Sequence, residues 1–228
     1  DTTEASKVVK KENERVAKLI DINSAARCTT VKPAGTTSLT VGTSSGIHAW
    51  HNDYYIRRIR VGKNEPIYTY LVNNHAELVE DEYFSPHSTA VISIPQRSPE
   101  GAIMRTESAL QLLKRVKQVT DEWVKPGFRK GQNTHNISAT VSIKDAEWVD
   151  VGEWMWDNRN SYNGLSVLPY DGGTYTQAPF EDCSKETYEA MMASLTRVDL
   201  SRVVEEEDNT DLKGEVACSG GACEVSFV

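Results

Sequence analysis

The residues of this chain best suited to chemistry form two neighbouring loops of small and hydroxyl-bearing side chains, Thr29-Thr30-Val31-Lys32-Pro33-Ala34-Gly35-Thr36-Thr37-Ser38 and Gly42-Thr43-Ser44-Ser45-Gly46-Ile47-His48. Pro33 disfavours helical geometry at Lys32, and Gly35 lets a ligand approach the main chain closely. The hydroxyls at positions 36–38 accompany the unpaired N–H groups of a first helical turn, whose dipole favours an anion. This pattern predicts a phosphate site, although loops of Gly, Ser and Thr are more often ordinary helix caps.

A second reactive feature is the pair of cysteines in Cys218-Ser219-Gly220-Gly221-Ala222-Cys223. The two glycines give the backbone the freedom to bring both sulfurs within disulfide distance. Two unremarkable thiols, a static disulfide or half of a metal site would share this spacing. A reducing cytoplasm disfavours a static disulfide, and the tail lacks the further ligands that zinc needs, so a mobile dithiol is the favoured interpretation.

The remaining metal-type and nucleophilic side chains give weaker signals. His48 and His51 flank Trp50 and could indicate a metal or an acid–base pair, but a third ligand and a carboxylate partner other than Asp53 are lacking. We therefore expect a structural or lining role for both histidines and predict no metal site. Cys28 and Cys183 are expected to be buried or incidental thiols.

The sequence of the whole chain resembles those of the ribonucleotide reductases, especially the monomeric adenosylcobalamin-dependent ribonucleoside-triphosphate reductases. The resemblance covers nearly all 228 residues in the family's order, through TTVKPAGTTSL, GTSSGIHAW, HNDYYIRRIRV, NTHNISATVS, NGLSVLPYDGGTY, QAPFEDC and ACSGGACE. It implies that the substrate phosphates are bound by Ala34, Gly35, Thr36, Thr37 and Ser38. It also implies that the same pocket is lined by Ser45, Gly46 and Ile47.

The resemblance also implies a role for the cysteine pair in the tail and shows that one motif of the family is absent. In the family, a tail pair such as Cys218 and Cys223 re-reduces the active-site disulfide by thiol exchange, and a thioredoxin-type donor reduces it in turn. The family's Asn-x-Cys-x-Glu pattern, which holds the thiyl-radical cysteine, is absent from all 228 residues. We therefore expect this oxidoreductase to convert ribonucleotides to deoxyribonucleotides only together with a missing N-terminal half. The alternative is a non-catalytic nucleotide-binding or disulfide-exchange module left from a split or degenerate reductase.

One strand bears on the cofactor that the resemblance implies. Class I reductases carry two adjacent radical-relay tyrosines on the last barrel strand, whereas Gly164-Leu165-Ser166-Val167-Leu168-Pro169-Tyr170 has no such pair. Tyr54 and Tyr55 are adjacent but lie on an earlier strand, where we expect them to pack. A radical generated by adenosylcobalamin fits better, with the cobalamin site largely outside this chain.

The composition limits which binding partners and which cellular location are expected for the chain. The chain has 39% hydrophobic residues and a formal charge of −8, which argues against broad binding to nucleic-acid backbones. No apolar run approaches the ~20 residues of a membrane span, and the first residues lack a signal-peptide pattern, so we expect no membrane role and a cytoplasmic location. The basic cluster Arg57-Arg58 with Arg60 predicts a strand whose charges face solvent or a partner.

Hydrophobic spacing predicts an α/β fold, which in the family's terms is the C-terminal half of the ten-stranded reductase barrel. Helices are expected near residues 6–20, 65–73, 107–124, 145–159 and 185–198, and strands near 54–61, 90–95, 137–143 and 165–168. The strand-helix-strand order predicts parallel pairing. We expect the half-barrel to span residues 1–204, starting mid-protein, and a flexible arm to span 205–228. An isolated half-barrel exposes strand edges, which predicts a partner or self-association.

Overall fold

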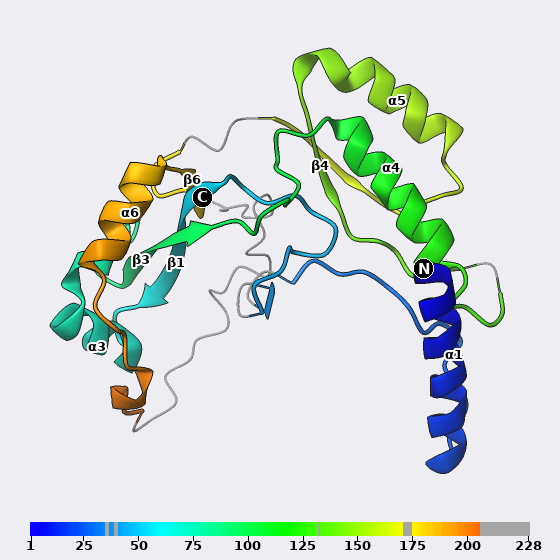
Figure 1. Ribbon diagram of the computed structural model, residues 1–228, viewed down its shortest axis with the longest axis horizontal. Coiled ribbons are helices and arrows are strands. Elements are labelled where there is room, and N and C mark those ends of the chain that lie inside the picture. The colour runs from blue at the N-terminus through cyan, green and yellow to red at the C-terminus, as the bar shows by residue number, and fades with distance from the viewer. Residues whose placement is uncertain (35–36, 39–40, 132, 171–174, 206–228) are drawn as a thin grey trace. The chain divides into compact units, whose positions relative to one another are not determined.

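The computed structural model describes residues 1–228 except 35–36, 39–40, 132, 171–174 and 206–228 (Figure 1). The described chain divides into two compact units, each assembled from two separate stretches of sequence. Unit 1 combines Asp1–Ala49 with Thr106–Tyr170, and unit 2 combines Trp50–Arg105 with Asp171–Val228. The two loops singled out above therefore belong to unit 1.

Unit 1 begins with the helix α1 (Thr2–Leu19), which starts where Asp1 caps it by accepting hydrogen bonds from the N–H groups of Thr3 and Glu4. Ser6 and Ala17 form its buried positions. The Ser6 hydroxyl donates a 2.8 Å hydrogen bond to the carbonyl of Trp123, which attaches α1 to a later part of the same unit. The predicted helix is confirmed, and the cap explains its earlier start.

The helix predicted at 107–124 is α4 (Ala109–Val119), which continues into a π-helical turn, η2 (Thr120–Val124). Ser108 and Gln111 form a reciprocal capping box at its start. Leu112, Leu113 and Val116 are buried on its inner face. A π-helical turn is rare and is often found at functional sites. The first of the two loops, residues 29–38, attaches at this turn.

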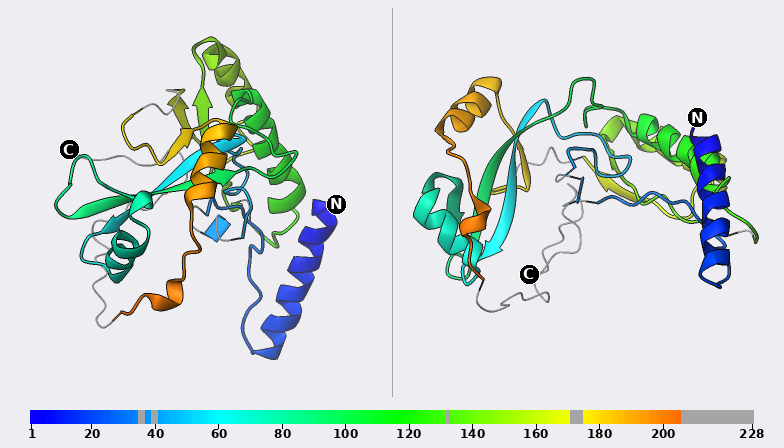
Figure 2. Two further views of the ribbon diagram at one scale, coloured as in Figure 1. Left: turned by 60° about the vertical axis from the view of Figure 1, so that its left-hand side comes forward. Right: turned by 60° about the horizontal axis from the view of Figure 1, so that its bottom comes forward.

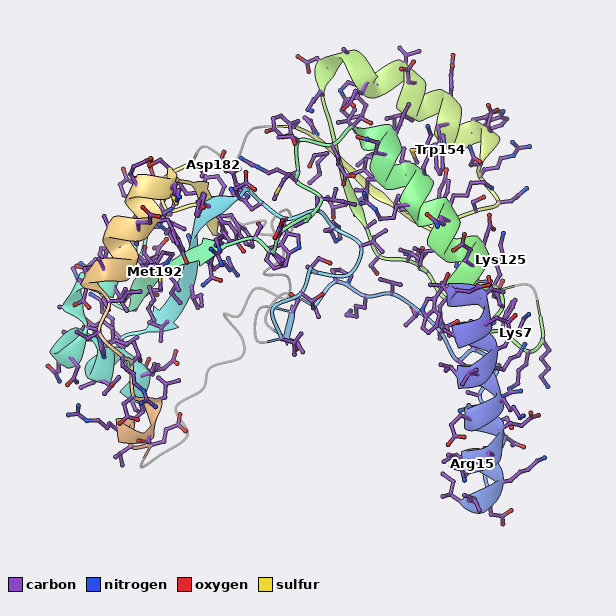
Figure 3. All side chains as sticks on the ribbon, in the orientation of Figure 1. Lys7, Arg15, Lys125, Trp154, Asp182 and Met192 are labelled. Atoms are coloured by element: carbon purple, nitrogen blue, oxygen red, sulfur yellow. The ribbon has the colours of Figure 1, made fainter. Side chains whose placement is uncertain are left out.

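The core of unit 1 is completed by β4 (Thr140–Ile143), the short helix η3 (Asp145–Glu147), α5 (Trp148–Asp157) and β5 (Ser166–Pro169). The strands β4 and β5 pair in parallel, with Val141 opposite Val167, so the predicted parallel unit is confirmed. Val141 and Ile143 are fully buried against α4 and α5. Trp154 packs on this core from α5 (Figure 3), whereas Trp156 is exposed.

Unit 2 is built on a four-stranded antiparallel sheet in the order β2-β3-β1-β6, so the parallel pairing predicted from the strand-helix-strand order is wrong for the strands predicted near 54–61 and 90–95. Its strands are β1 (Tyr54–Gly62), β2 (Val79–Asp81), β3 (Thr89–Arg97) and β6 (Phe180–Asp182). Its helices are α3 (Pro66–Asn74), η1 (Ala76–Leu78), α6 (Lys185–Ser194) and η4 (Leu200–Arg202). Figure 2 shows α3 and α6 beside this sheet, where α3 contributes Tyr70 and Leu71 to the core.

The arginines of β1 are used inside unit 2, so the expectation that they face solvent or a partner needs correction. Arg57 is buried, with its guanidinium 4.4 Å from the centre of the Phe180 ring. Arg58 pairs with Glu181 at 2.6 Å, and Arg60 lies 3.6 Å from Glu82. The acidic partners come from the neighbouring strand β6 and the segment after β2, which the local alternation in β1 could not reveal.

The described residues form a mixed α/β structure with one four-stranded and one two-stranded sheet, and these sheets do not close into a barrel. Assignment to half of a ten-stranded barrel remains a proposal. Residues 206–228 lie outside the described part, so the boundary at 205 also stays a prediction. Among the described helices, none is both long and apolar enough to cross a membrane.

Candidate functional site

The first loop is anchored at Thr29, which is buried against the π-helical turn. Its hydroxyl lies 2.6 Å from the carbonyl oxygen of Trp123 and 3.3 Å from that of Val124. Gly127 makes this approach possible, because a Cβ atom at that position would lie 1.8 Å from the Thr29 Oγ1. The unusual turn therefore supplies the acceptors that seat the start of the loop.

The next two residues run alongside the segment that leads into β4. The Trp123 indole donates a 3.0 Å hydrogen bond to the Thr30 carbonyl, and the Thr30 hydroxyl donates to the carbonyl of Asn136 at 3.1 Å. Val31 forms a parallel bridge with Ile137. The loop is thus fixed on both sides before it reaches Lys32.

Three of the five predicted phosphate-binding residues are described. Ala34 and Thr37 are exposed, whereas Ser38 is buried. The Ser38 N–H donates a 3.1 Å hydrogen bond to the Ala34 carbonyl, so a helical turn forms where the sequence predicts one. Gly35 and Thr36 lie outside the described residues. Phosphate binding by all five remains a prediction.

The second loop packs directly on the first. Gly46 has a φ of +60°, and a Cβ atom there would lie 3.3 Å from both the Cα and the nitrogen of Pro33. Glycine is therefore needed for the backbone conformation and for the close approach. The structure in this way brings the predicted lining residues Ser45, Gly46 and Ile47 beside the predicted phosphate loop.

Ser45 carries an unused hydrogen-bonding group at this junction. Its hydroxyl oxygen is buried and has no hydrogen-bond partner within the described part of the chain. Its carbonyl, in contrast, accepts from both the N–H and the Nδ1 of His48, at 3.1 and 2.9 Å. A buried hydroxyl without a partner is costly, so a ligand oxygen at this place would be favourable.

His48 and Arg115 connect the second loop, residues 42–48, to β4 and α4. His48 Nε2 accepts a 3.0 Å hydrogen bond from the N–H of Thr140, the first residue of β4. The Arg115 guanidinium donates to the Ile47 carbonyl at 3.0 Å and pairs with Glu107 at 2.6 Å. The structural or lining role predicted for His48 agrees with these contacts. Sequence reasoning missed Arg115, which lies on α4 with no local motif around it.

His51 belongs to unit 2 and has a different environment. Its Nε2 lies 3.0 Å from a carboxylate oxygen of Asp182, which also pairs with Arg105 at 2.9 Å. Its ring stacks on Phe180 with the ring centres 5.3 Å apart. Burial, followed by the charge of Arg105, lowers the pKa of His51 to about 4 although Asp182 opposes the change. The sequence offered only Asp53 as a carboxylate partner, because Asp182 is distant along the chain.

The cysteines divide into described and undescribed pairs. Cys28 and Cys183 are half-buried and free. Burial, with the charges of Glu181 and Asp182, raises the pKa of the Cys183 thiol, so it is a poor nucleophile. Cys218 and Cys223 lie outside the described residues. Within the described part of the chain, no group of three His, Cys, Asp or Glu side chains could hold a metal ion.

Comparison with known proteins gives this geometry a context. No family model matches the chain. The adenosylcobalamin-dependent ribonucleoside-triphosphate reductase of Lactobacillus acidophilus is 27% identical over 211 residues, or 90% of this chain and 27% of that protein. The enzyme of the same name from Lactobacillus leichmannii is 27% identical over 223 residues, or 96% of this chain and 29% of that protein.

A solved structure agrees with the sequence matches. The crystal structure of a B12-dependent, class II ribonucleotide reductase superposes with a TM-score of 0.67 at 27% identity, over 84% of this chain and 26% of that one. The chain is therefore similar in sequence and fold to ribonucleotide reductases. Within them, its similarity is to the adenosylcobalamin-dependent ribonucleoside-triphosphate reductases, as the sequence motifs predict. It spans just over a quarter of the length of these curated relatives.

Proposed function

We propose that this chain is the C-terminal part of an adenosylcobalamin-dependent ribonucleoside-triphosphate reductase, in which unit 1 binds the phosphates of the substrate. The first loop supplies residues 34–38 and the second supplies residues 45–47. The observation that carries the proposal is the close approach of Gly46 to Pro33, which brings the two loops together, beside a buried Ser45 hydroxyl that has no partner among the described residues. The similarity to the reductases over about nine tenths of the chain supports it.

The chain contributes binding and positioning to the proposed reaction. Hydroxyl and N–H donors held in place before the substrate arrives would orient the nucleotide without reorganisation at the moment of reaction. The thiyl radical that attacks the ribose would come from a cysteine outside this chain, since no Asn-x-Cys-x-Glu pattern is present. The chain alone is then a nucleotide-binding part and not a complete oxidoreductase.

Adenosylcobalamin would supply the radical in such an enzyme, and we expect its site to lie largely outside this chain. Both ring nitrogens of His48 are bound to backbone groups, at Ser45 and Thr140. The His75 nitrogens face Tyr70 and Thr196. These two imidazoles are therefore already engaged within the protein.

The proposed role of the tail is to return electrons after each turnover. The thiolate of one tail cysteine attacks the active-site disulfide, which forms a mixed disulfide and releases one active-site thiol. The second tail cysteine then attacks the tail sulfur of that mixed disulfide and releases the other active-site thiol. Two thiols are restored at the active site, and Cys218 and Cys223 become a disulfide. A thioredoxin-type dithiol in the cytoplasm would reduce that disulfide in turn.

The phosphate proposal is tested by titrating the purified 228-residue chain with ATP, ADP and adenosine in a calorimeter. We expect affinity to increase with the number of phosphates. Gly46→Ala should weaken ATP binding about tenfold, because the added Cβ presses on Pro33 and adds strain of ~1 kcal/mol or more at a positive φ.

Gly42→Ala is the matched control, since Gly42 has a φ of +64° but open space around the added Cβ. It should carry similar backbone strain and leave ATP affinity within about twofold. Adenosine binding as tightly as ATP, or equal losses in the two variants, would contradict the proposal. Phosphate binding without any reductase activity in the assembled protein would favour the non-catalytic module instead.

A further inference from the structure

The three consecutive carbonyls of the second loop are each held by a side chain. The Ser45 carbonyl accepts from His48 Nδ1 at 2.9 Å, and the Gly46 carbonyl accepts from the Ser44 hydroxyl at 3.2 Å. The Ile47 carbonyl accepts from Arg115 at 3.0 Å. Every peptide plane between residues 45 and 48 is therefore fixed in orientation by the protein.

These contacts also set the direction of the N–H groups. In a trans peptide the N–H points opposite to the carbonyl of the same plane, and the described backbone contains no cis peptide. The N–H groups of Gly46 and Ile47 therefore face away from the partners of the Ser45 and Gly46 carbonyls. Neither N–H has a hydrogen-bond acceptor within the described residues. Together with the unpartnered Ser45 hydroxyl they make three unused donors on one short segment.

His48 is the residue that joins this segment to the core. Thr140 N–H donates to Nε2, so that nitrogen carries a lone pair and Nδ1 carries the proton that is donated to the Ser45 carbonyl. A single neutral tautomer makes both contacts. Arg115 acts in parallel, since its guanidinium is braced by both oxygens of Glu107, at 3.1 and 2.6 Å.

We propose that His48 is a positioning residue, which holds the Ser45–Ile47 segment so that its three unused donors receive an anionic phosphate oxygen. The proposal rests on the phosphate site described above and assigns how that site is preorganised. His48 itself does not touch the ligand. Its contact with Ser45 sets the donors, and its contact with Thr140 fixes the ring on β4.

The test uses inorganic tripolyphosphate as the probe and calorimetry on the 228-residue chain. His48→Leu removes both contacts and should weaken binding at least tenfold. His48→Asn places an amide donor at the position of Nδ1 and should bind within about threefold of the unmodified chain. His48→Gln places its amide at the position of Nε2, loses the Ser45 contact and should lose about as much affinity as His48→Leu.

Thermal unfolding separates positioning from a merely structural role. His48→Asn and His48→Gln each lose one hydrogen bond and should lower the unfolding midpoint by similar amounts, yet their affinities should differ. Affinity losses that simply follow the loss of stability would overturn the inference. So would tripolyphosphate binding that His48→Leu leaves unchanged, an outcome that would leave the phosphate site itself intact.

A substitution of Arg115 tests the positioning of the same segment independently of His48. Arg115→Met releases the Ile47 carbonyl and should also weaken tripolyphosphate binding at least tenfold. Lys7→Met removes the same charge from the exposed surface of α1 and should change affinity less than twofold (Figure 3). Equal losses in both variants would show a net-charge effect and overturn the inference. No binding by the unmodified chain would overturn the proposed phosphate site along with it.

Discussion

His51 shows how the surroundings of one residue can remove it from acid–base chemistry. The ring is stacked on Phe180 and meets the edge of Tyr55, and its pKa is lowered to about 4. At neutral pH it is therefore an uncharged packing group beside the Arg105–Asp182 ion pair. The sequence predicts this structural role from the lack of nearby ligands, but Asp182 and Phe180 become neighbours only through the pairing of β6 with β1.

The lowered pKa makes the stability of unit 2 depend on pH in a defined window. Between pH 6.5 and about 4 the unfolded chain binds a proton at His51 that the folded chain does not. The free energy of unfolding should therefore fall as the pH falls through this window, by about 1–2 kcal/mol after solvent screening. Urea unfolding at pH 7 and pH 4.5 measures it.

His51→Phe is the control for this pH dependence, since it keeps an aromatic ring against Phe180. Other carboxylates also titrate over this range, so the difference between the two proteins carries the test. The variant should lose about 1–2 kcal/mol less stability between pH 7 and pH 4.5 than the unmodified chain. Identical pH profiles would contradict the assigned environment of His51.

At the scale of elements, the π-helical turn η2 and the first loop form one unit of structure. Thr29 reaches the turn's carbonyls, and Gly127 leaves the space that its side chain fills. Hydrophobic spacing predicts the helix through Val124 and its end at Pro126-Gly127, but the spacing is nearly the same for an α-helical and a π-helical last turn. The contact of Gly127 with Thr29 depends on tertiary packing and has no local sequence signal.

This junction predicts a large effect from a single methyl group. Gly127→Ala should lower the free energy of unfolding by about 3 kcal/mol, because the added Cβ would overlap the Thr29 side chain. Gly152→Ala on α5 meets nothing within 4 Å and should raise stability by about 1 kcal/mol through helix propensity. Denaturant unfolding compares the two. Similar losses would contradict the packing described here.

For the whole molecule, the sequence predicts which known proteins are similar better than it predicts how the strands pair and how the chain divides into units. Motifs such as TTVKPAGTTSL predict the similarity to class II reductases, and the comparisons with known proteins confirm that similarity. The split into two discontinuous units depends on the antiparallel return of β3 and β6 onto β1, which strand propensity does not specify. The strand-helix-strand order correctly predicts the parallel pairing of β4 with β5, but the same reasoning fails for β1 and β3, which pair antiparallel although α3 lies between them.

The proposed tail chemistry requires the assembled enzyme. With the remaining reductase chain present, Cys218→Ser or Cys223→Ser should reduce turnover at least tenfold when a thioredoxin-type protein is the reductant. A small dithiol such as dithiothreitol can reach the active-site disulfide directly and should restore most of the rate. Deoxyribonucleotide formation measures both. Full activity of the variants with the protein reductant would contradict the assigned role.

The proposed binding of ribonucleoside-triphosphate phosphates by unit 1 can be measured by hydrogen exchange of the 228-residue chain with and without ATP. We expect slower exchange in peptides that cover residues 33–48, where the two loops meet at Gly46 and Pro33. Adenosine should leave the same peptides unchanged. Unaltered exchange across residues 33–48 at saturating ATP, or slowing confined to unit 2, would contradict it.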